Sequence, residues 1–68
     1  MRLVKDKTLE PVNVGDVLHT FRGEPVIVTG WREPGRIQST GRVYLRSMDE
    51  RGIEGEYFPS VVNCHWRV

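Results

Sequence analysis

The stretch that decides the fold is EYFPSVVNCHW, residues 56–66, an apolar run with a proline in its middle. Proline cannot donate a hydrogen bond to a β ladder, and it keeps the preceding residue out of helical geometry. The residues on either side of Pro59-Ser60 alternate in the manner of strands. We therefore predict two strands joined by a corner, in which Pro59 ends the first strand and Ser60 caps a short helical turn.

Length and composition describe a small folded domain. The chain has 68 residues, 38% hydrophobic and 28% charged, which fits a single domain over residues 1–68 with a thin core. Its longest uninterrupted apolar run is three residues, Val26 to Val28, so we expect neither a membrane span nor a signal peptide. Cys64 is the single cysteine, which excludes an intramolecular disulfide. We therefore expect an intracellular protein.

Short alternating runs between glycines and prolines predict an all-β fold. No window keeps the apolar spacing of an amphipathic helix, and seven glycines and four prolines interrupt the chain at short intervals. We predict five strands, at residues 16–21, 26–31, 42–48, 53–58 and 63–68. The corner before the last strand would let such short strands close into a small barrel without exposed edges.

Turn chemistry sets the expected strand registers. The run Asp49 to Gly52 suits a type I turn that ends on a left-handed glycine, so residues 50–52 form the expected loop and Arg46 lies opposite Glu56. This register also places Tyr44 opposite Phe58. In the preceding hairpin, Gly23-Glu24 suits a two-residue type II′ turn, which places Phe21 opposite Val26 and His19 opposite Val28.

Alternation assigns side chains to the two faces of the sheet. In the third predicted strand, Val43 and Leu45 point inward, whereas Arg42, Tyr44 and Arg46 point outward. In the last strand, four residues share one face: Val62, Cys64, Trp66 and Val68. We expect Cys64 and Trp66 to be buried.

The segment GEYFPSVV, residues 55–62, resembles the end of Src-homology-3 domains, where Gly-x-Phe-Pro-Ser leads through one helical turn into the last strand. The order of the predicted elements is similar too. The resemblance implies a five-stranded Src-homology-3-like barrel with a short helical turn before the last strand. In that family the corner proline, Pro59 here, helps to cradle proline-rich peptides. The family's Ala-Leu-Tyr-Asp-Tyr motif and its pair of tryptophans are absent from this sequence.

A spaced pattern over nearly the whole chain is similar to small uncharacterised proteins encoded by tailed phages and prophages. The matching residues are 14–16, 21–24, 30–31, 39–44 and 56–61. This resemblance implies that the protein acts in the cytoplasm of a bacterial host.

We expect neither a catalytic centre nor a metal or cofactor site. Cys64 and His65 are neighbours in a strand, so their side chains point to opposite faces, and the only other histidine is His19. No motif groups a nucleophile with a base and an orienting residue, and no glycine-rich loop opens a helix. The sequence therefore predicts a non-enzymatic binding module.

The first hypothesis for the partner is nucleic acid. The net charge is only +1, but eight of the ten basic residues are arginines. Small barrels bind single strands by combining basic residues with exposed aromatic rings on which bases stack. The outward row Arg42, Tyr44 and Arg46 has this composition, and the loop beside it adds Arg32 and Arg36. The alternative for this row is a solvated sheet face of cross-strand charge pairs.

The second hypothesis is a protein partner, either a host protein or a virion protein. Tryptophan, tyrosine and arginine are enriched at the residues that dominate protein interfaces. Trp31 is the expected anchor, beside the irregular loop 32–41, unless it is a core or lid residue under that loop. Exposed strand edges would also permit self-association.

Overall fold

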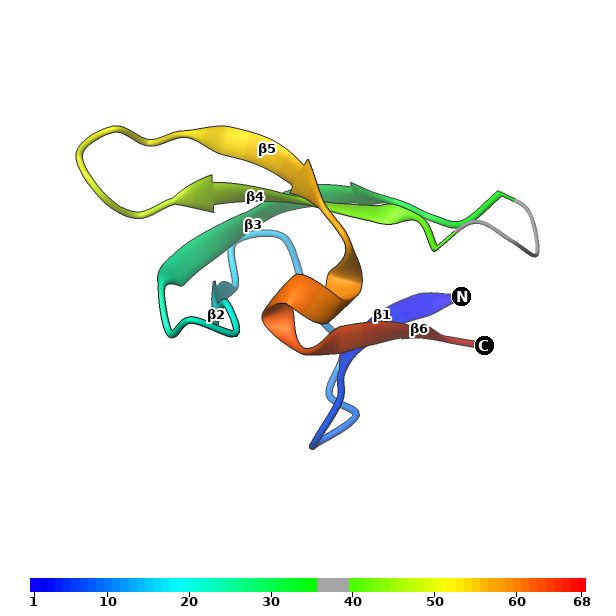
Figure 1. Ribbon diagram of the computed structural model, residues 1–68. Helices are drawn as coiled ribbons and strands as arrows, with labels where there is room; N and C mark the ends of the chain where they lie inside the picture. The colour runs from blue at the N-terminus through cyan, green and yellow to red at the C-terminus, as the bar shows by residue number, and fades with distance from the viewer. Residues whose placement is uncertain (36–39) are drawn as a thin grey trace.

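The computed structural model describes residues 1–35 and 40–68, and these form an all-β fold of two antiparallel sheets (Figure 1). The described residues contain six strands and one 3₁₀ turn, in the order β1 (Arg2–Lys5), β2 (Val17–His19), β3 (Pro25–Arg32), β4 (Arg42–Ser47), β5 (Glu54–Tyr57), η1 (Pro59–Val62) and β6 (Cys64–Arg67). Strands β2 to β5 make a four-stranded meander, and β1 pairs with β6. All five predicted strands are present, as β2 to β6, but most of them are shorter than predicted.

Strand β1 was not predicted from the sequence. It runs antiparallel to β6, with Leu3 opposite Trp66, so the two ends of the chain lie side by side (Figure 1). On its other edge, the Val12 amide donates to the Leu3 carbonyl at 2.9 Å. The prediction of five strands in one closed barrel therefore needs correcting to six described strands in two sheets. The partner of β1 lies about sixty residues away, so local alternation could not reveal it.

One hydrophobic cluster fills the space between the two sheets. Its buried members come from every strand except β5, from the segment between β1 and β2, and from the corner: Leu3, Val12, Leu18, Val26, Val28, Val43, Leu45, Val62 and Cys64. The inward orientation predicted for Val43, Leu45 and Cys64 is confirmed. Trp66 is only half-buried, against the edge of the cluster, so the prediction that it is buried is wrong. Val68 was predicted to share the face of Cys64 and Trp66, but it is fully exposed and does not reach the core.

The corner predicted at Pro59 is confirmed as the single turn η1. Pro59 occupies its first position, where the fixed φ of proline suits a helical start. The residue before the turn is Phe58, in extended conformation, and no side chain caps the turn, so the capping role predicted for Ser60 is wrong. Asn63 ends the turn in the left-handed conformation at φ 56°, which redirects the chain into β6.

The β4–β5 hairpin contains the predicted turn but not the predicted register. Gly52 has a φ of 56°, and its amide donates to the Asp49 carbonyl at 3.2 Å. However, Arg46 lies opposite Glu54 instead of Glu56, and Tyr44 lies opposite Glu56 instead of Phe58.

Side chains within the β4–β5 loop explain this difference. The Asp49 carboxylate accepts hydrogen bonds from the amides of Arg51 and Gly52, at 3.0 and 3.3 Å. The Ser47 amide donates to the Ile53 carbonyl at 2.8 Å, and the Ser47 hydroxyl accepts from the Ile53 amide at 2.9 Å. Ser47 and Ile53 are therefore the last pair joined by hydrogen bonds before the loop. The register moves by two residues, which leaves every side chain on its predicted face.

The β2–β3 hairpin also differs from the prediction. Leu18, not Phe21, lies opposite Val26, and His19 lies opposite Pro25 instead of Val28. The Thr20 hydroxyl accepts from the Glu24 amide at 3.2 Å, and the Thr20 amide donates to the Glu24 carbonyl at 2.9 Å. The predicted two-residue turn is thus replaced by a longer loop closed by a threonine. Because the register moves by three residues, Leu18 enters the core and Phe21 is exposed.

Candidate binding surfaces

The outward row predicted on β4 is present, but carboxylates accompany it. We call the solvent side of the four-stranded sheet the outer face; it carries Ile27, Gly30, Arg32, Arg42, Tyr44, Arg46, Glu54 and Glu56. A bulge at Thr29 keeps Gly30 and Arg32 on this face. Arg46 has Glu54 directly opposite, and Tyr44 has Glu56. Three arginines therefore share the face with two glutamates.

Hydrogen bonds and ion pairs hold the acidic side chains over the outer face. The Thr29 hydroxyl donates to the Glu54 carboxylate at 2.7 Å. The Arg32 guanidinium lies 3.6 Å from the Glu56 carboxylate, and both of these side chains are more than half exposed. An exposed pair of this kind contributes about 0–1 kcal/mol to stability, so Arg32 is only weakly neutralised.

Arg42 is held at the end of β4 by uncharged partners. Its guanidinium carbon lies 4.2 Å from the centroid of the Phe58 ring, within the range of a cation–π contact. The same guanidinium donates to the Gly41 carbonyl at 2.7 Å and to the Thr40 hydroxyl at 3.4 Å. Arg42 therefore links the outer face to the corner that begins at Phe58.

Tyr44 lies over a glycine. A Cβ atom at Gly30, its cross-strand neighbour, would stand 3.2 Å from Cδ2 of the Tyr44 ring. The ring therefore rests on the backbone of β3, and Tyr44 is half-buried. This contact holds the Cδ2 and Cε2 side of the ring against the sheet.

Two other predicted site residues have different positions. Trp31 is half-buried and packs against the hydrophobic core, which is the core or lid alternative considered for it. Arg36 lies outside the described residues, as does the centre of the predicted loop 32–41. Of the predicted residues that are described, Arg32, Arg42, Tyr44 and Arg46 are brought together on the outer face.

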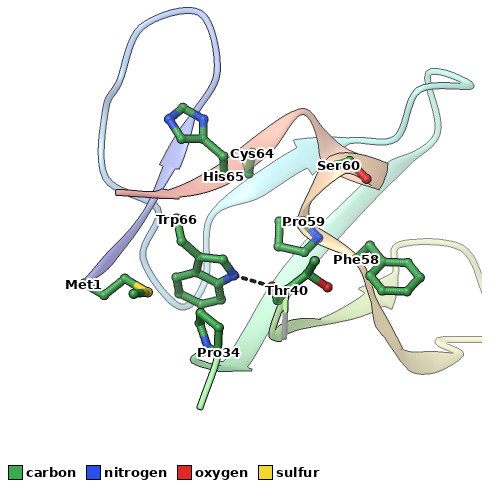
Figure 2. Close-up of a pocket in the computed structure, with 9 residues that line it drawn as sticks. All are labelled: Met1, Pro34, Thr40, Phe58, Pro59, Ser60, Cys64, His65 and Trp66. Atoms are coloured by element: carbon green, nitrogen blue, oxygen red, sulfur yellow. Dashed lines mark hydrogen bonds between the residues drawn. The ribbon is translucent and has the colours of Figure 1, made fainter. Parts of the chain in front are cut away.

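A second surface was not predicted from the sequence. Beside the corner lies an open groove of about 370 Å³, whose walls include Met1, Pro34, Thr40, Phe58, Pro59 and Trp66 (Figure 2). We call it the corner groove. Apart from Thr40 these six residues are apolar, Ser60, Cys64 and His65 complete the lining, and Phe58 is 50% exposed. In the sequence, Phe58 and Pro59 are neighbours and mark the corner, whereas Pro34 and Trp66 come from distant parts of the chain. Sequence patterns could therefore not show that these four residues meet.

A hydrogen bond fixes one wall of the corner groove. The Trp66 indole N–H donates to the Thr40 carbonyl at 2.6 Å, which ties β6 to the segment before β4 (Figure 2). Gly41 has a φ of 65°, and a Cβ there would lie 2.6 Å from the Arg32 carbonyl oxygen. Only glycine fits this position, so Gly41 brings Thr40 and Pro34 to the groove.

The titratable side chains on β6 do not form a catalytic group. The Cys64 thiol is buried, and the pKa of this thiol is raised to about 11, first by burial and then by the Asp6 carboxylate. A thiol with so high a pKa is a poor nucleophile at neutral pH. His65 points away from it on the other face of β6, where Nδ1 lies 2.6 Å from the Asp6 carboxylate. Among the described residues, no three histidine, cysteine or acidic side chains are grouped to hold a metal ion.

Comparison of the chain with models of protein families, with curated proteins and with solved structures finds no match. In residues 1–35 and 40–68, no helix has the length and apolarity needed to cross a membrane.

Proposed function

We propose that this chain is a non-enzymatic binding module that holds an extended segment of a partner protein in the corner groove. The observation that carries the proposal is the groove itself, in which an exposed phenylalanine, a tryptophan and two prolines converge from three separate parts of the chain. Aromatic-lined grooves are the usual receptors for extended, proline-containing segments, because rings and pyrrolidines stack with little loss of conformational entropy.

We further propose that the scaffold is Src-homology-3-like. The order of the elements supports this, since a meander is followed by the 3₁₀ turn at Pro59 and a last strand that pairs with the first. A phage or prophage protein that acts in a bacterial host is the setting we propose from the sequence resemblance. Self-association through strand edges stays a prediction, and Glu54 and Glu56 on the edge strand β5 oppose it.

The test of the groove is a pair of matched phenylalanine variants. Phe58→Ser removes a groove wall that is 50% exposed, whereas Phe21→Ser removes a ring on the β2–β3 loop that is 67% exposed and also has an arginine near it. Each protein is panned against a displayed library of random short peptides. We expect wild type and Phe21→Ser to enrich peptides rich in proline and apolar residues, and Phe58→Ser to lose this enrichment. Equal enrichment by all three proteins, or none by wild type, contradicts the proposal.

Nucleic acid is the second candidate partner, and one feature of the outer face favours it. Arg32 and Arg42 lie directly opposite each other on neighbouring strands, an arrangement that is unfavourable without an anion nearby. A phosphate could lie there while a base stacks on Tyr44. Glu54 and Glu56 on the same face oppose a polyanion. Titration with labelled oligonucleotides at low and high salt tests this candidate. Binding that weakens steeply as salt is added supports it, because phosphate contacts are salt-dependent, and no binding at low salt contradicts it.

A further inference from the structure

The corner groove ends against a concentration of positive charge. Phe58 and Thr40 are both walls of the groove, and the Arg42 guanidinium contacts both of them, at 4.2 Å from the Phe58 ring centroid and 3.4 Å from the Thr40 hydroxyl. Arg32 lies directly opposite Arg42 in the β3–β4 ladder. The Cβ atoms of directly opposed residues lie about 4.5–5.5 Å apart, so the Arg32 side chain leaves the sheet next to the arginine that contacts the groove walls.

Within residues 1–35 and 40–68, this charge is only partly neutralised. Among the described residues, the partners of Arg42 are a ring, a hydroxyl and a carbonyl, and none of the carboxylates there forms an ion pair with it. Residues 36–39 are Arg, Ile, Gln and Ser, so they contain no carboxylate either. In the part of the chain that the structure describes, Arg32 forms an ion pair with Glu56, at 3.6 Å and exposed to solvent. Of these two neighbouring arginines, Arg32 thus has an exposed carboxylate as its partner and Arg42 has none among the described residues.

We infer that the partner of the corner groove is an extended protein segment with apolar or proline residues followed by an aspartate or glutamate, whose carboxylate binds between Arg32 and Arg42. The apolar part of the segment lies against Phe58, Pro59 and Trp66. The acidic side chain then relieves the repulsion between the two arginines, and the guanidinium fork suits a carboxylate. This inference rests on the proposed function and adds the chemistry of the ligand to it.

A basic segment is the wrong ligand for the same reason. It would bring a third positive charge to the end of the groove where Arg32 and Arg42 already stand, and like charges at an interface are strongly unfavourable. A purely apolar segment would fill the groove but leave the two guanidiniums uncompensated. Charge at the groove end therefore determines which peptides the module prefers, while the apolar walls determine whether it binds at all.

The test compares the double variant Arg32→Gln with Arg42→Gln against Arg46→Gln. Arg46 lies on the same face and the same strand as Arg42, four positions further along and directly opposite Glu54, so it is the matched control. All proteins are panned against the displayed library of random short peptides. We expect wild type and Arg46→Gln to select apolar or proline residues together with an acidic residue at one end. The double variant should select the same apolar residues without the acid.

Synthetic labelled peptides then measure the effect. A selected peptide and its Glu→Gln counterpart are titrated with each protein by fluorescence anisotropy. We expect the acidic peptide to bind wild type about threefold to tenfold more tightly, the scale of one or two exposed charge pairs, and to lose this advantage at high salt or in the double variant.

The outcomes separate the two proposals. Apolar selection without any preference for acid, or a preference that survives in the double variant, overturns the inference and leaves the proposed function standing. No apolar selection by wild type overturns both.

Discussion

At the scale of single residues, Cys64 shows how the thin core controls chemistry. Burial raises the pKa of its thiol from 9.0 to about 11, the Asp6 carboxylate adds to this, and Lys5 opposes it. The unfolded chain therefore loses the thiol proton at a lower pH than the folded chain. We predict that the Cys64 contribution to stability is constant below pH 9.0 and is lost as the pH rises towards about 11. Urea unfolding at pH values on both sides of this window measures it.

The control for this prediction is Cys64→Ala. Tyrosines and lysines also titrate in alkaline solution, so only the difference between the two proteins reports on the thiol. The variant should be less stable below pH 9.0, and its deficit should shrink as the pH rises through the window. A deficit that stays the same at every pH would show that the thiol ionises alike in both states, and the prediction would be wrong.

At the scale of elements, the segment between β3 and β4 depends on one glycine. We predict that Gly41→Ala destabilises the fold by about 1–3 kcal/mol, the usual cost of a strained backbone position. Its φ of 65° is unfavourable for alanine, and the new Cβ would lie 2.6 Å from the Arg32 carbonyl oxygen. The hydrogen bond from the Trp66 indole N–H to the Thr40 carbonyl should weaken as well. Chemical unfolding followed by tryptophan fluorescence reports both effects.

Gly35 provides the control within the same segment. A Cβ at Gly35 would have no atom within 4 Å, and its φ is not positive. Gly35→Ala should therefore leave the unfolding midpoint close to that of wild type. If the two variants are equally stable, Gly41 is not the residue that positions Thr40 and Pro34.

For the two hairpins, the sequence could predict where a loop lies but not the register of the strands beside it. Turn composition located the β4–β5 loop, because Asp49 and Gly52 have strong and specific turn preferences. It could not give the register, which depends on how the side chains of Ser47 and Asp49 satisfy loop amides. In the β2–β3 loop, Thr20 has the same role, and a hydroxyl that can bond several amides favours no single register.

At the scale of the whole molecule, the sequence predicted the residues of the outer face but not those of the corner groove. Arg42 and Tyr44 share a face because strands alternate with period two, which is a local rule. The corner groove combines Pro34, Phe58 and Trp66, which no local rule relates to one another. The pairing of β1 with β6 likewise joins the two ends of the chain. Features made by contacts between distant segments were therefore the ones missed.

The pairing of the chain ends leads to the last prediction. Leu3 on β1 is 2% exposed and belongs to the hydrophobic cluster, which has nine buried members among the described residues. Leu3→Ala should cost about 2–5 kcal/mol, the usual range for a leucine truncated in a core. A domain below about 70 residues seldom has more than about 3–5 kcal/mol of stability from its core, so this variant should be largely unfolded at room temperature. Circular dichroism and urea unfolding measure the loss. Val14→Ala, at a 63% exposed position, is the control and should shift stability by less than about 0.5 kcal/mol. A folded, cooperative Leu3→Ala protein would mean that β1 is dispensable and that the four-stranded sheet and β6 form a sufficient core without it.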